Sequence, residues 1–130
     1  LNCQLVVSHN RQQLVPEFSL LNNNPSKDGR PGASRHGWQF NLDWQLPVLN
    51  GTVSAQFNHT EMQDSDGYSP LLAGGAERWL KRSYVLMQYR QALTDRTTML
   101  INGDHQHQRS NLELFRSRDS SIEIGISHQF

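Results

Sequence analysis

Apolar and polar residues alternate over long stretches of this chain. In HGWQFNLDWQL, the even positions from 38 to 46 are all apolar, and the odd positions from 37 to 45 are glycine or polar. A period of two residues places successive side chains on opposite faces of a strand, whereas a helix would scatter them. The alternation resumes in TVSAQFNH, after a turn that carries Asn50-Gly51. The two stretches therefore predict a β-hairpin.

The same pattern recurs before and after this hairpin. It is present at the N-terminus, in KRSYVLMQYRQAL, in TMLINGDHQHQ and in the closing SSIEIGISHQF. The sequence therefore predicts an all-β fold, an antiparallel meander of about six long strands. The expected strands are residues 1–9, 37–46, 52–59, 82–93, 98–107 and 121–130.

The connections between the expected strands have two lengths. Residues 47–51 and 94–97 are short, whereas residues 10–36, 60–79 and 108–120 are long and rich in turn-forming residues. Because short and long connections alternate strictly, we expect all short turns at one end of the strands. The last residue of the chain falls at that same end.

Two environments suit such strands. A soluble barrel turns its apolar face inward, whereas a membrane barrel turns it outward and encloses a polar lumen. Strands of about 9 to 11 residues suit a tilted membrane crossing, and lysine is nearly absent from them. Aromatic residues near strand ends, which suit membrane interfaces, are Trp38, Trp44, Phe57, Tyr89 and Phe130. We therefore expect part of an up-and-down transmembrane β-barrel, with a soluble ligand-binding β-barrel as an alternative.

Composition narrows the function classes further. The chain has 130 residues, a formal net charge of zero and one cysteine. A neutral chain lacks the basic footprint of a nucleic-acid-binding protein, so we expect no nucleic acid among its partners. The lone Cys3 excludes an intrachain disulfide. No apolar run approaches the roughly 18 residues of a membrane helix.

The number of strands points beyond this chain. Six strands are too few, because membrane barrels start at about eight, and Leu1 falls in the middle of an expected strand. We therefore expect residues 1–130 to form one domain that is the C-terminal fragment of a larger β-barrel. Either further strands precede Leu1 in the full protein, or several chains share one barrel.

The closing IEIGISHQF resembles the terminal strand of bacterial outer-membrane β-barrel proteins of the terminal-Phe type. This resemblance implies a location in the bacterial outer membrane, with membrane lipid and the barrel-assembly machinery as partners and a periplasmic C-terminus. It also implies that the alternating apolar residues at the end form the signal read by that machinery. Those residues are Ile122, Ile124, Ile126 and Phe130.

A second resemblance covers about residues 66–130. DGYSPLLAGGAER and QRSNLELF, each followed by a strand, resemble segments of the C-terminal barrel of proteobacterial proteins with periplasmic tetratricopeptide-type repeats. Members of that group export polysaccharide or help to move proteins to the cell surface. The resemblance implies a pore or export channel for such cargo.

Charged residues on the polar faces of the strands are the candidate functional residues. In a membrane barrel they would face the lumen, where they set selectivity and bind polar cargo in a pore, or form structural ion pairs in a closed barrel. Both interpretations stay open, so a structural anchor or a barrel that displays adhesion loops is an alternative to the export channel. The candidates are Asp43, Arg82, Arg90, Asp104 and Glu123.

The sequence offers little for catalysis or metal binding. His105 and His107 share a strand face beside Asp104, but two imidazoles are too few ligands for a metal site. The chain has no Gly-x-Ser-x-Gly elbow, no glycine-rich phosphate loop and no Cys-x-x-Cys pair. We therefore expect no enzyme activity, no metal and no cofactor.

Overall fold

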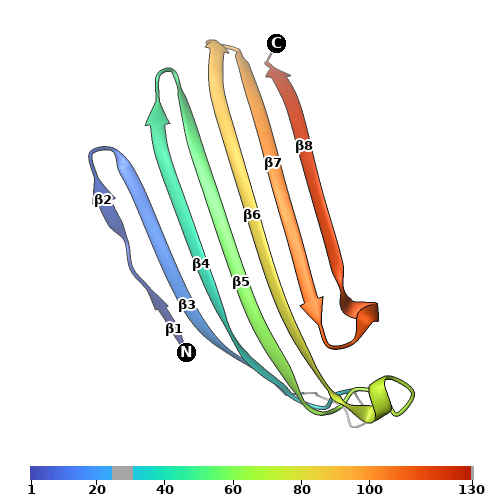
Figure 1. Ribbon diagram of the computed structural model, residues 1–130. Helices are drawn as coiled ribbons and strands as arrows, with labels where there is room; N and C mark the ends of the chain where they lie inside the picture. The colour runs from blue at the N-terminus through green and yellow to red at the C-terminus, as the bar shows by residue number, and fades with distance from the viewer. Residues whose placement is uncertain (25–30, 130) are drawn as a thin grey trace.

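The structure, a computed structural model, describes residues 1–24 and 31–129 and forms one antiparallel β-sheet (Figure 1). Two short 3-10 helices, η1 (Ala73–Gly75) and η2 (Glu113–Phe115), lie in connections between strands. Among the described residues, no helix has the length and hydropathy needed to span a membrane. The strands are β1 (Asn2–Gln4), β2 (Val7–His9), β3 (Gln12–Asn23), β4 (Arg35–Val48), β5 (Gly51–Gly67), β6 (Glu77–Thr94), β7 (Thr97–Ser110) and β8 (Ser117–His128).

The strands follow one another across the sheet in chain order. From β3 to β8 each strand pairs with the next, and β1 and β2 both pair with β3. The predicted all-β, antiparallel up-and-down meander is therefore confirmed. The sheet is open, because within the described residues neither β1 nor β2 pairs with β8 at the opposite edge.

Six of the strands are long, as expected, but they are not the six that the alternation located. Residues 12–23, expected inside a long loop, form β3, and residues 1–9 form two strands of three residues each. The strands β4 to β8 are found where they were expected but are longer, and β5 runs on to Gly67. Phe57, expected near a strand end, consequently lies in the middle of β5.

Pro16 explains both the missed strand and the interrupted edge beside it. A proline within an alternating run argues against a strand, because it lacks the N–H that a ladder needs. The backbone N–H of Leu5 donates to the Pro16 carbonyl oxygen at 3.1 Å. In an antiparallel strand, the backbone nitrogen and the carbonyl of one residue point to the same side. The nitrogen of Pro16 therefore also faces the N-terminal edge strand, but it has no hydrogen to donate. The regular pairing of the N-terminal edge is lost at this point, which separates β1 from β2.

Short turns lie at one end of the sheet and longer connections at the other, as predicted, except that residues 10–11, expected to begin a long connection, form a further short turn (Figure 1). After β2 the chain reverses within two residues, Asn10 and Arg11, whose φ angles of 45° and 68° are left-handed. Such angles match the twist of a tight hairpin. Thr97 pairs with His128, so β8 ends at the short-turn end.

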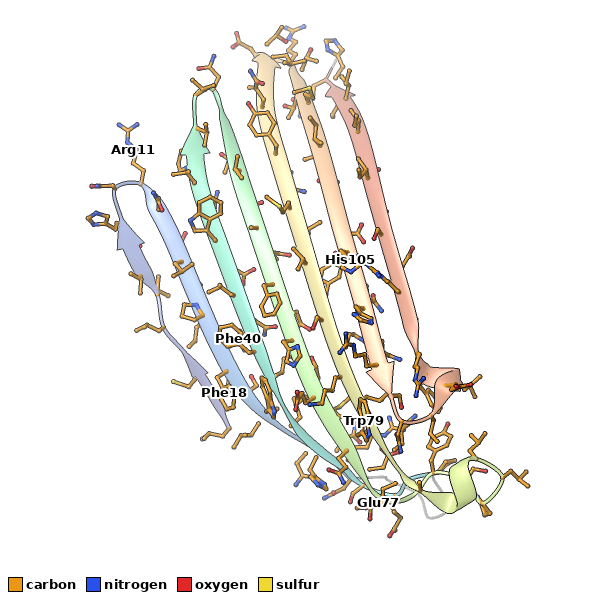
Figure 2. All side chains as sticks on the ribbon, in the orientation of Figure 1. Arg11, Phe18, Phe40, Glu77, Trp79 and His105 are labelled. Atoms are coloured by element: carbon orange, nitrogen blue, oxygen red, sulfur yellow. The ribbon has the colours of Figure 1, made fainter. Side chains whose placement is uncertain are left out.

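No second layer of secondary structure covers either face of the sheet in the described part of the chain (Figure 2). There the buried hydrophobic side chain is Leu112, which is 4% exposed. Ile122 and Ile124 of β8 are 82% and 70% exposed. The fold therefore lacks the apolar core of a two-layer domain.

Candidate functional site

The pairing register gathers the charged candidates on one side of the sheet, the polar face. The row from Asp43 through Gln56 and Leu86 to Asp104 crosses four strands in register. Side chains two residues apart on a strand share a face, which places the other three candidates with this row. The polar face thus carries Asp43 on β4, Arg82 and Arg90 on β6, Asp104 on β7 and Glu123 on β8.

Uncharged side chains link neighbouring strands across the polar face. Gln88 Nε2 donates to Asn102 Oδ1 at 2.9 Å, which joins β6 to β7. The Asn58 amide donates to Asn41 Oδ1, which joins β5 to β4, and Gln39 Nε2 donates to the same oxygen at 3.0 Å. Amides and hydroxyls both donate and accept, so this face presents hydrogen-bonding groups of both kinds.

The charged candidates are hydrogen-bonded to neutral partners or are exposed. Arg82 donates through Nε and Nη2 to Gln108 Oε1, at 2.9 and 2.6 Å, and Asp104 accepts from the Ser121 hydroxyl. Arg90 is exposed. None of the five candidates forms an ion pair with another described residue. Their charges therefore remain open to solutes that approach this face.

A buried group of charges, the loop-end cluster, closes the polar face beside the long connections. Asp64 of β5 is 1% exposed and is held between two arginines. Its carboxylate lies 2.9 Å from Arg35 Nε of β4 and 3.0 Å from Arg78 Nε of β6. A buried carboxylate is stable only when its charge is matched and hydrogen-bonded, and the two guanidinium groups provide this.

Two aromatic rings complete the loop-end cluster. The Arg78 guanidinium carbon lies 4.3 Å from the centre of the Tyr68 ring and 4.5 Å from that of Phe115. The rings meet edge to face at 5.0 Å between centres, and stacking on them favours a desolvated arginine. Sequence reasoning missed this cluster because it assigned these residues to loops. DGYSP and LELF, which supply the rings, were the available signal.

The opposite side of the sheet is the apolar face. Neighbouring rings pack along it, with Phe18 and Trp38 at 6.0 Å and Phe40 and Phe57 at 6.3 Å between centres (Figure 2). The apolar belt comprises Leu14, Pro16, Phe18, Leu20, Trp38, Phe40, Leu42, Trp44, Leu46, Val53, Ala55, Phe57, Val85, Met87, Tyr89, Met99, Ile101, Ile122, Ile124 and Ile126.

The border of the apolar belt on the long-loop side runs obliquely across the strands. On β4 the belt reaches Trp38, whereas on β8 it stops at Ile122, which is level with Trp44 of β4 in the register. The border thus shifts by about six residues, or about 20 Å at roughly 3.3 Å per residue, over four strand spacings of about 4.8 Å. It makes an angle of about 45° with the strands.

Three of the four C-terminal residues and both histidines singled out in the sequence lie on the apolar face. Ile122, Ile124 and Ile126 are exposed in the belt, and Phe130 lies outside the described residues. His105 Nδ1 lies 2.7 Å from the Ser120 hydroxyl. Among the described residues, no group of three or more His, Cys, Asp or Glu side chains is placed to hold a metal ion.

Comparison with known proteins gives no match: no family model matches the chain, and no curated protein and no solved structure matches it.

Proposed function

We propose that this chain is part of an outer-membrane β-barrel, with the apolar belt against lipid and the polar face toward the lumen. The observation that carries the proposal is the exposed apolar belt with its oblique border. Strands of membrane barrels tilt by about 35–45° from the membrane normal. A border parallel to the membrane plane would therefore cross the strands obliquely, and the observed angle of about 45° agrees with this.

The length of the belt supports the same proposal. On β4 it extends from Trp38 to Leu46, about nine residues, which is the length of a tilted crossing. The strands continue beyond the belt on the long-loop side, where β5 and β6 carry Glu61 and Lys81 on the same face. In a soluble barrel this face would turn inward, and the charges would then enter the core.

The barrel needs more strands than this sheet contains. Because β1 and β2 form one interrupted strand, the sheet has seven strand positions, whereas bacterial single-chain barrels have even numbers from eight upward. Within the described residues, no further strand pairs with the outer edge of β8 or with that of the N-terminal strands, and lipid cannot satisfy the backbone groups of an open sheet edge. We infer that strands upstream of Leu1, or strands of other chains, close the barrel.

Within such a barrel, the polar face suits a pore or export channel for surface polysaccharide or protein. Both cargoes are polymers with many hydrogen-bonding groups, and the linked Asn and Gln side chains offer donors and acceptors to them. Arg82, Arg90 and the acidic candidates would set the selectivity of the pore. Ile122, Ile124, Ile126 and Phe130 would act earlier, as the assembly signal, and leave the C-terminus in the periplasm.

A structural anchor is the second candidate function, and the loop-end cluster favours it. Arg78 and Asp64 belong to the polar face, so Tyr68 and Phe115 fold over that face where the long connections begin. Loops folded over the mouth of a barrel narrow it. A barrel closed in this way would hold a periplasmic domain or display its loops.

Conductance of the full-length protein in planar lipid bilayers separates these functions. The channel predicts discrete open levels, and Arg90→Glu should shift their selectivity toward cations. Arg11→Glu, in the turn between β2 and β3, is the matched control and should leave selectivity unchanged. Silent bilayers with inserted protein would support the anchor. Protein that stays in the aqueous phase when vesicles are floated would overturn the membrane proposal and favour a soluble ligand-binding barrel.

A further inference from the structure

Beyond the oblique border, the apolar face of β6, β7 and β8 carries positive charge. Lys81 lies directly opposite Arg109, and His107 lies opposite Arg118. These four residues form the basic corner. Two cations opposite each other on adjacent strands, as Lys81 and Arg109 are, repel each other, so this pair gains from a bound anion. The whole chain has a formal net charge of zero, and the corner is therefore a local concentration of charge.

The protein itself supplies few counter-charges there. Glu61 pairs with Lys81, with 2.9 Å between the carboxylate oxygen and the ammonium nitrogen. Glu113 lies 3.8 Å from Arg116, the next arginine beyond the corner. Within the described part of the chain, no carboxylate lies within ion-pair distance of Arg109 or Arg118, and both are exposed. Two guanidinium groups thus remain available to a ligand.

A hollow of about 500 Å³ lies at the basic corner, a volume within the range of small-molecule sites. Its lining includes Trp79, His107, Arg109, Arg116 and Arg118. Arg116 is held in place by its Nε, which donates to the Ser110 carbonyl oxygen at 2.8 Å. Trp79, labelled in Figure 2, is 37% exposed and contributes an aromatic side chain to the hollow. The hollow therefore combines arginine side chains with an aromatic surface.

We propose that the basic corner binds the phosphate monoester headgroup of an anionic membrane lipid whose acyl chains lie on the apolar belt. Arginine binds phosphate oxygens in a bidentate manner, which suits Arg109 and Arg118. On β8, Ile122 follows Arg118 by four residues on the same face. The cations therefore lie where the headgroup of a lipid would be, and the apolar surface lies where its acyl chains would be. This inference rests on the proposed membrane position of the belt.

The basic corner and the adjoining belt together favour one class of ligand over the others. A free phosphate ion would use the arginines but would gain nothing from Ile122 and Val85, the belt residues nearest to the corner on β8 and β6. A neutral lipid would use the belt and leave Arg109 and Arg118 unpaired. A lipid with a phosphate monoester satisfies both.

The test is lipid binding by the full-length protein in phosphocholine nanodiscs. The discs contain increasing fractions of phosphatidic acid, and native mass spectrometry counts the retained lipids. The double variant Arg109→Gln/Arg118→Gln should bind phosphatidic acid about tenfold more weakly than the unmodified protein, because two charge-assisted contacts are removed. The matched control Arg11→Gln/Arg96→Gln removes the same charge from exposed turn residues at the opposite end of the strands and should retain full binding.

Each outcome has a separate meaning. Equal retention by both double variants would overturn the proposal. The proposal would also be overturned if the unmodified protein retained phosphatidic acid no better than phosphocholine lipid, and if millimolar inorganic phosphate displaced the bound lipid as effectively as the double substitution does. That result would indicate a site for a free anion. Failure of the protein to enter nanodiscs at all would overturn the proposed membrane function, which is a different result from insertion without lipid selectivity.

Discussion

The loop-end cluster and the apolar belt place their side chains in opposite ways. In the cluster, Asp64 and Arg78 are charged and buried, whereas in the belt Ile122 and Ile124 are apolar and exposed. A protein surrounded by water normally shows the reverse arrangement. The difference indicates that the two faces of the sheet meet different surroundings, which supports the proposed position of the belt in lipid. Measurements of stability test whether the two regions differ in this way.

Asp64→Asn should have the largest effect on stability. The substitution leaves Arg35 and Arg78 without their counter-charge, and breaking a buried ion pair costs about 3–5 kcal/mol. Urea unfolding of the full-length protein folded in detergent micelles measures the change. Asp66→Asn, an exposed neighbour, is the control and should unfold like the unmodified protein. If both variants unfold alike, the cluster does not stabilise the fold.

Ile124→Arg should come next. A charged side chain on the lipid face of a barrel costs about 2–4 kcal/mol near the middle of the membrane. In water the same exposed position would tolerate the change to within about 0.5 kcal/mol. Folding of the protein into vesicles, followed by denaturant titration, measures this cost. Ser121→Arg, on the polar face of the same strand, should be nearly neutral. A neutral Ile124→Arg would contradict the lipid contact of the belt.

Gly32→Ala should have the smallest effect of the three. Gly32 has a φ of 78°, and a β-carbon there would collide with the Asp64 carboxylate. We expect a loss of about 1–2 kcal/mol from backbone strain and displacement of that carboxylate. Gly103→Ala is the control, because a β-carbon at this strand position has open space around it. The same urea titration compares the two variants, and equal midpoints would show that Asp64 adjusts freely.

The two regions also differ in how well the sequence predicts them. The faces of β4 to β8 follow from alternation, which is a local property of each strand, so the shared face of the polar candidates and the part of the belt on these five strands could be predicted. Strand β3 was missed because Pro16 interrupts an otherwise regular pattern. The true strand ends were missed because residues such as Gln63 and Ser110, typical of loops, extend the ladders beyond the belt.

The loop-end cluster was beyond prediction from local patterns. Asp64 meets Arg35 and Arg78 only because β5 pairs with both β4 and β6, and because a register shift follows Gln63. Phe115 reaches the same place from η2, far along the chain. No local pattern marks these residues in their own segments, and the cluster forms only when the strands pair.

The interruption opposite Pro16 determines where this sheet opens first. β1 and β2 hold β3 through three residue pairs each, whereas β4 pairs with β5 along its whole length. Thermal fluctuations therefore detach the N-terminal margin before any other strand, and amide hydrogen exchange should begin there. A barrel closed through this margin has a weak lateral seam between the N-terminal strands and β3, on the opposite side of the sheet from the terminal strand β8.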